Sequence, residues 1–233
     1  MYTISFTTDY RDLNEKAFHI LWEKDMRALK KALMPRMDGK FFSKDALLSF
    51  MKGDFSENAP LIQERCIFYQ NQWHLQEKKW QQYLKRFFAR ETSPKTLTAA
   101  FTFLPLYPRD LENNCFLIPV LESCPDACSV IAHELTHFYD YDVWEQISDD
   151  FTLTTSKKWI LSELLIPFLF RDFGEKTGYF FHCSSYLFSK EGLKQCYPVF
   201  QNAWRQKEPF FFFLKEMETQ DFSQYIHTQF LQD

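Results

Sequence analysis

Residues 129–140 read Ser-Val-Ile-Ala-His-Glu-Leu-Thr-His-Phe-Tyr-Asp and contain the pattern H-E-x-x-H. His133 and His137 are four residues apart, so in a helix both side chains project from the same side, about one turn from each other. Their imidazoles can then converge on one zinc ion, and Glu134 between them can act as a general base toward a water molecule beside the metal. The apolar pattern predicts that this helix runs from after Pro125 to about residue 147.

A catalytic zinc site needs a third protein ligand and an open coordination position. Glu163 is the strongest candidate, because it is the only charged residue between Lys158 and Arg171, within a second helix predicted over about 157–170. A buried carboxylate without a partner is costly, so Glu163 needs one, and zinc would provide it. The alternative is an ion pair between Glu163 and an arginine or lysine from elsewhere in the chain.

Other third ligands compete with Glu163. Asp149 and Asp150 lie in a polar segment that is expected to be an exposed turn, and His182 is a later histidine that could also serve the reaction or the core. The metzincin pattern is excluded, because it requires a glycine and a histidine where Asp140 and Val143 stand.

Composition excludes several other classes of protein. The 233 residues are 45% hydrophobic and 25% charged, as in an ordinary globular protein, and the net charge of −4 gives no footprint for nucleic acid. The five glycines cannot form a dinucleotide-binding turn or a P-loop, and G-x-S-x-G is missing. The N-terminus lacks the features of a signal peptide, and the longest apolar run, over 159–170, is too short to span a bilayer. We therefore expect a cytoplasmic protein with free thiols and no membrane partner.

The remaining segments predict an α+β fold that is mostly helical. We expect one domain with a helical N-terminal part over 1–95, a core over 96–170 and a helical C-terminal part over 171–233. Apolar β-forming runs at 96–106 and 116–121 predict a small antiparallel sheet with exposed edges, packed on the H-E-x-x-H helix and the helix of Glu163. Additional helices, predicted over 12–33, 43–53, 60–91 and from 192 onward, flank this core.

The string His133-Glu-Leu-Thr-His137, followed by Asp140-Tyr141, resembles the zinc helix of thermolysin. Two motif histidines followed by a glutamate from the next helix are similar to the gluzincin group of zinc metallopeptidases, and the resemblance covers residues 116–170. It implies a zincin-like core of compact, minigluzincin-like size, with one Zn²⁺ per chain bound by His133, His137 and Glu163 and with Glu134 as the base.

The resemblance also implies a peptide or protein substrate, bound as an extended chain along the strand at 99–104. An oxyanion donor would come from the C-terminal part, from Tyr179, His182 or Tyr186. The sequence departs from the family at Pro167, which stands where an aspartate usually orients a zinc histidine, so Asp140 is a possible substitute. Two other functions stay open: a catalytically idle zinc-binding interaction or regulatory module, and a zinc hydrolase of a non-peptide amide.

Overall fold

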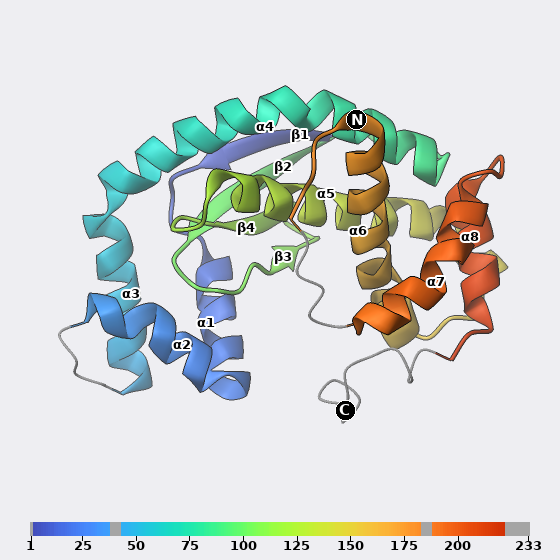
Figure 1. The fold of residues 1–233 in the computed structure, drawn as a ribbon. Helices are drawn as coiled ribbons and strands as arrows, with labels where there is room; N and C mark the ends of the chain where they lie inside the picture. Colours follow the sequence, from blue (N-terminus) through green and yellow to red (C-terminus); the bar gives the residue numbers. More distant parts are fainter. Residues whose placement is uncertain (1, 38–42, 183–187, 222–233) are drawn as a thin grey trace. The chain divides into compact units, whose positions relative to one another are not determined.

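The structure is a computed structural model, and it describes residues 2–37, 43–182 and 188–221 (Figure 1). These residues are mostly helical, with one small four-stranded sheet. They form two compact units, one made of residues 1–76 and 93–134 and the other of 77–92 and 135–233. In chain order the elements are β1 (Tyr2–Thr7), α1 (Asp12–Lys24), α2 (Met26–Leu33), η1 (Met34–Arg36), α3 (Lys44–Glu57), α4 (Ala59–Phe88), β2 (Lys95–Thr102), β3 (Arg109–Asp110), β4 (Cys115–Pro119), α5 (Cys124–Ile147), η2 (Ser148–Asp150), α6 (Thr155–Thr177), α7 (Lys190–Ala203) and α8 (Pro209–Glu218).

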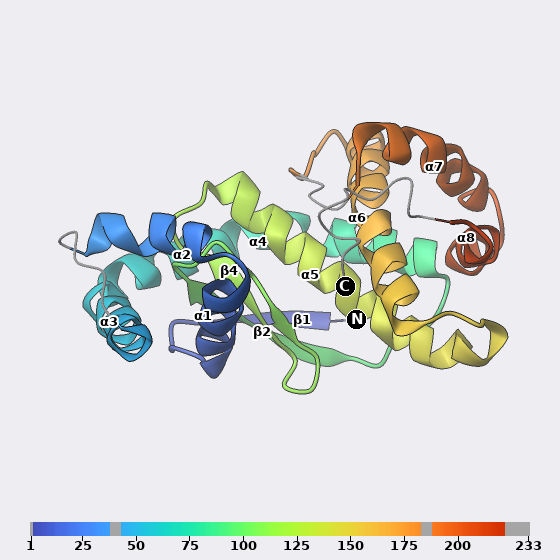
Figure 2. The ribbon, with the colours of Figure 1, turned by 90° about the horizontal axis from the view of Figure 1, so that it is seen from below.

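The first unit is built on the sheet, of which Figure 2 labels β1, β2 and β4. The strand order is β1-β2-β4-β3. β1 pairs with β2 and β2 pairs with β4 in parallel, while the short β3 pairs with β4 in antiparallel. The prediction of an antiparallel sheet is therefore wrong for the three longer strands. One signal of the parallel arrangement is β4, which is buried at every residue, as is typical of parallel strands covered on both faces.

The N-terminal part is not wholly helical, because its first residues form β1. Tyr2 and Ile4 are buried and the intervening Thr3 and Ser5 are exposed, which is the alternation of a strand covered on one side. β2 lies between β1 and β4. The prediction that residues 99–104 form an exposed edge for an extended peptide is therefore wrong at Ala99 and Ala100, which pair with β1 on one side and with β4 on the other.

Helices cover both faces of this sheet. Ala100 and Leu117 face one side and belong to a core formed with α1, α2 and α3. On the other side, Tyr69 of α4 stacks on Phe101, and its hydroxyl donates to the carbonyl oxygen of Glu122 at 2.8 Å. Since Glu122 lies between β4 and α5, this hydrogen bond connects α4 to the segment that precedes α5.

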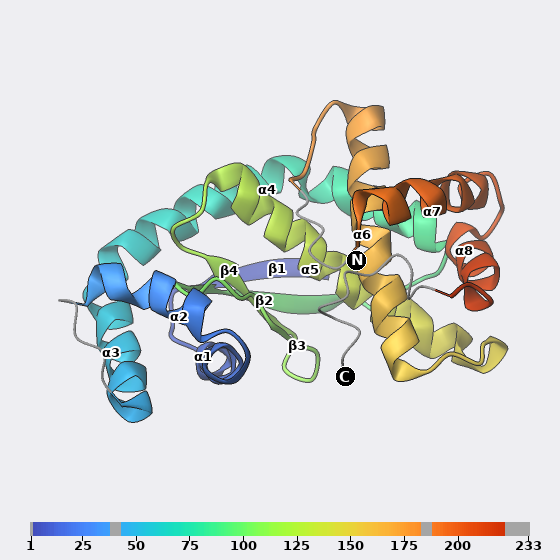
Figure 3. The ribbon, with the colours of Figure 1, turned by 60° about the horizontal axis from the view of Figure 1, so that its bottom comes forward.

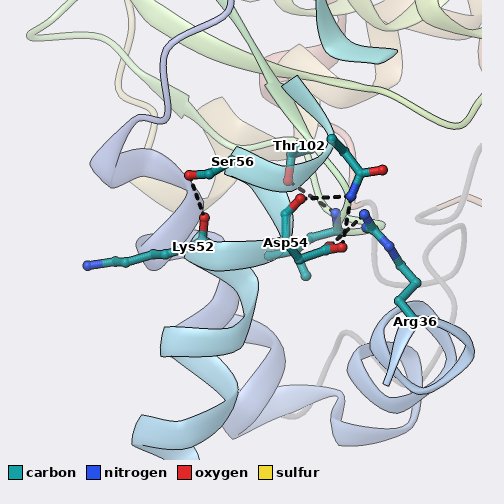
Figure 4. Close-up of polar contacts among 7 residues, drawn as sticks. Arg36, Lys52, Asp54, Ser56 and Thr102 are labelled. Atoms are coloured by element: carbon teal, nitrogen blue, oxygen red, sulfur yellow. Dashed lines mark hydrogen bonds and ion pairs between the residues drawn. The ribbon is translucent and has the colours of Figure 1, made fainter. Parts of the chain in front are cut away.

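An ion pair between the partly buried Arg36 and the buried Asp54 links η1 to α3 (Figure 4). Arg36 Nη2 lies 2.5 Å from Asp54 Oδ2, and the guanidinium lies 3.5 Å from the centre of the Phe103 ring. The side-chain amide of Asn58 donates to Asp54 Oδ1 at 3.0 Å. Burial raises the pKa of Asp54, and the adjacent Arg36 opposes that shift. Arg36 thus stabilises the charged form of Asp54, and the ion pair connects the two helices.

The second unit is held together by aromatic side chains. α7 packs against both α6 and α8 (Figure 3). Trp80 of α4 makes edge-to-face contacts with Phe170 and Phe173 of α6, at centroid distances of 5.5 and 5.0 Å. Much of the high phenylalanine content is therefore core packing around α6. None of the helices in the described residues is both long and apolar enough to cross a membrane.

Candidate metal centre

Helix α5 carries the H-E-x-x-H pattern, as predicted, and ends at the predicted residue, Ile147. Residues within and beside the H-E-x-x-H pattern are apolar and buried, including Ile131, Ala132 and Leu135, so this part of the helix packs against the protein core. His137 is fully buried, whereas the side chain of His133 is 26% exposed. The one-turn spacing therefore places one imidazole inside the protein and the other where solvent can reach it.

Helix α6 supplies the acidic residue. The Thr154 side chain caps its first turn by accepting from the backbone N–H of Lys157 at 3.2 Å, and Gly178 ends it with a φ of 74°, which favours glycine. Between these ends Glu163 is buried, with 7% of its surface exposed. Pro167 lies inside the same helix and offers no N–H to the carbonyl oxygen of Glu163.

Within the described part of the chain, one group of histidine and acidic side chains has the geometry to hold a metal ion. It consists of His133, His137 and Glu163, whose ligand atoms all lie within 4.8 Å of one another. Nε2 of His137 lies 3.3 Å from Oε1 of Glu163. Two imidazole nitrogens and one carboxylate oxygen are a donor set that zinc accepts, with room for a fourth ligand. The residues present therefore fit a zinc ion.

The second nitrogen of the buried histidine has its own partner. Nδ1 of His137 lies 2.6 Å from Oγ of Ser162, the residue before Glu163. When Nδ1 donates its proton to this hydroxyl, Nε2 keeps its lone pair and faces Glu163. The Ser162 hydroxyl can accept this hydrogen bond, and in that arrangement His137 has the tautomer that can bind a metal.

Glu134 is buried beside a cation. Its Oε2 lies 3.3 Å from Nη1 of Arg109 on β3, and its Oε1 lies 3.9 Å from Nε2 of His133. Its side chain is only 6% exposed. The carboxylate predicted to act as a base is therefore held between a guanidinium and the first histidine of the pattern.

The other predicted residues are placed as follows. Asp149 and Asp150 lie in η2 and are exposed, as expected of a polar turn, and His182 is also exposed; none of the three belongs to the metal group. Tyr179 is half-buried, with its ring against Phe181. Tyr186 lies outside the described residues. Asp140 is buried on α5, and its role toward a histidine stays a prediction.

Sequence reasoning missed Arg109 and Ser162. Arg109 lies in a segment that reads as a turn-rich connection, and nothing in the sequence places it beside Glu134. Ser162 could have been noticed, because it is a hydroxyl residue next to the one acidic residue of an apolar helix. Its distance from His137, 25 residues along the chain, hides the contact.

Comparison with known proteins gives no family for this chain. No protein-family model matches it, and neither curated proteins nor solved structures include a significant match. Function must therefore be argued from the site itself.

Proposed function

We propose that this chain is a zinc-dependent hydrolase of peptide bonds. The observation that carries the proposal is the group formed by His133, His137 and Glu163, with the carboxylate of Glu134 beside it. A buried histidine and a buried glutamate facing each other at 3.3 Å are costly to keep in a core without a further function. A structural zinc site would be closed by four protein ligands, whereas this group supplies three.

Each residue has a role that its surroundings support. His133, His137 and Glu163 would hold the ion, which when bound supplies Lewis acidity toward water and toward the substrate carbonyl. Ser162 would keep His137 in the required tautomer. Glu134 would take a proton from the attacking water and later deliver it to the leaving nitrogen. An exposed edge of His133 leaves access from solvent.

The peptide would bind beside β3 rather than along β2. β3 is an edge strand of the sheet, and its Arg109 contacts Glu134. An extended chain added to an edge strand gains main-chain hydrogen bonds, which suits a substrate whose side chains vary. This replaces the excluded arrangement at residues 99–104.

Two measurements on the purified protein test the proposal. Elemental analysis should find about one zinc per wild-type chain. Glu163→Ala should lower the affinity for zinc, measured by dialysis against a chelator, by about 100-fold or more. Glu175→Ala is the matched control, because Glu175 is an exposed glutamate on the same helix, paired with Arg171. It should retain zinc as the wild type does.

Peptide hydrolysis is then measured by mass spectrometry on a mixed peptide library, with wild type and Glu134→Gln at equal zinc content. Loss of the general base should slow hydrolysis by about 100- to 10,000-fold. Equal rates in both proteins would contradict the mechanism. Zinc binding by the wild type without hydrolysis of any peptide would instead identify an idle zinc-binding module, and a wild type that binds no zinc after reconstitution would remove the proposal altogether.

A further inference from the structure

Arg109 is a partly buried cation, and no sequence motif predicts its position. Its backbone is fixed from two directions. It pairs with Phe116 in the antiparallel ladder of β3 and β4, and the next residue, Asp110, accepts hydrogen bonds at 3.0 Å from both the backbone and the side chain of Asn113 in the adjoining turn. These hydrogen bonds restrict the backbone of the hairpin and so restrict the position from which the Arg109 side chain extends.

The side chain extends from this hairpin to α5. Arg109 and Glu134 are 16% and 6% exposed, so water screens their 3.3 Å contact only weakly. Residues paired across two strands share a face of the sheet, which places Arg109 on the face of Phe116. In the register of β2 and β4, Phe116 lies beside Ala99, on the face opposite to Ala100 and Leu117. The register of the sheet therefore places Arg109 on the face opposite to the core formed with α1, α2 and α3, and from there its side chain contacts Glu134 of α5.

The two oxygens of Glu134 have different surroundings. Oε2 faces Nη1 of Arg109, while Oε1 faces Nε2 of His133 at 3.9 Å. A carboxylate held only by its own rotatable bonds could exchange these oxygens. A guanidinium in contact with one of them restricts that rotation.

We propose that Arg109 is a positioning residue for Glu134: it holds Oε2, so that Oε1, on the side of His133, is the oxygen that receives the proton. The inference rests on the proposed function. In the step it assists, an O–H bond of water breaks, its proton moves to Oε1, and the electron pair stays on the water oxygen that attacks the carbonyl carbon. As the new C–O bond forms, the π pair of the carbonyl moves onto the carbonyl oxygen. When the C=O bond re-forms, the C–N bond breaks and its electron pair leaves with the nitrogen, which receives the proton from Oε1.

The first test separates positioning from substrate binding. Arg109→Ala and Arg109→Lys are compared with wild type for zinc content, kcat and KM on one cleaved peptide. Arg109→Ala should lower kcat by about 10- to 100-fold, with KM changed by less than about 3-fold and zinc content unchanged. Arg109→Lys should recover part of the loss, because an ammonium can contact one oxygen but lacks the planar guanidinium.

The first test includes a control variant, and two of its outcomes would refute the positioning role of Arg109. Arg11→Ala should leave all three quantities unchanged, because the side chain of Arg11 is exposed and pairs with the exposed Asp9. An unchanged kcat in Arg109→Ala would refute the proposal. A rise in KM alone would also refute it, and would mean that Arg109 binds an anionic group of the substrate instead.

The second test needs no hydrolysis. Melting temperatures of zinc-free wild type, Arg109→Ala, Glu134→Gln and the double variant form a cycle. Each single change should lower the melting temperature by roughly 5 °C, and the double variant should lose clearly less than the sum. Additive losses would show that the two side chains are not coupled, which overturns the proposal.

The two tests keep this inference distinct from the proposed function. Hydrolysis that Glu134→Gln abolishes and Arg109→Ala leaves intact would remove the role of Arg109 alone. A wild type without hydrolysis would remove the proposed function and the positioning role together. In that case a non-additive cycle would leave only a structural ion pair.

Discussion

Ser162 offers the sharpest test of how the candidate centre is built, because its hydroxyl contacts a metal ligand without being one. Ser162→Ala removes the partner of His137 Nδ1, which lies 2.6 Å away. His137 is completely buried, so no bulk water replaces the lost hydrogen bond. We expect two separate effects, one on the metal-free fold and one on metal affinity.

The burial of His137 sets the expected size of the effect on stability, and its hydrogen bond with Ser162 sets the expected size of the effect on metal affinity. A buried polar group left without a partner costs about 1–3 kcal/mol, so the metal-free variant should lose that much free energy of unfolding. Loss of a hydrogen bond that orients a ligand histidine typically lowers metal affinity by about 10- to 100-fold. That range corresponds to about 1.4–2.7 kcal/mol of binding free energy.

Zinc affinity is measured by competition with a chelator of known strength, and stability by urea unfolding of the metal-free proteins. Ser129→Ala is the matched control. Ser129 is also a buried helical serine, and its hydroxyl donates to the carbonyl oxygen of Pro125 at 2.6 Å, on α5. It should bind zinc as tightly as wild type. Equal affinity in Ser162→Ala and wild type, or an equal loss in Ser129→Ala, would refute the reasoning.

Two further predictions concern stability. Arg36→Met should lower the free energy of unfolding by about 3 kcal/mol in urea titrations, because it leaves the buried carboxylate of Asp54 without its cation. The double variant Arg36→Met/Asp54→Leu should recover most of this loss, and a double variant as unstable as the single one would contradict the prediction. Burial raises the pKa of the Cys196 thiol to about 11, above its usual value of 9.0. The folded state therefore holds the proton more tightly than the unfolded chain, so the urea midpoint should fall as the pH rises from about 9 to 11, and should fall less in Cys196→Ala. Equal slopes in both proteins would show that Cys196 does not contribute.

The helices could be predicted because their information is local. The pattern around His133 predicted a helix that ends at about residue 147, where α5 ends. The apolar run around Glu163 predicted the central part of α6. The helix predicted over 12–33 is divided at Asp25, whose side chain accepts from the backbone N–H of Ala28 at 2.9 Å and so begins a new helix. This is a local signal as well, since aspartate is a favourable first residue for a helix.

Strand partners could not be predicted in the same way. β1 lies beside β2, yet more than 80 residues separate Ile4 from its neighbour Leu97. Composition shows that such segments favour strands, but pairing direction depends on how the intervening helices return the chain. The antiparallel assignment of β2 and β4 failed because the connection between them carries β3, which pairs antiparallel with β4, so that β4 runs parallel to β2. The expected peptide-binding edge failed where β1 pairs with β2, as far as Ala100.

By itself, the sequence determined three elements of the candidate centre: two histidines on one helix face, a carboxylate between them, and a lone acid on a second apolar helix. Each follows from helical periodicity or from the cost of burying charge, which act within a few turns of chain. Only the tertiary structure decided that Glu163 and Ser162 meet His137 and that Arg109 meets Glu134. Those contacts join residues about 25 positions apart, and their geometry depends on how helices and strands pack together rather than on any local preference.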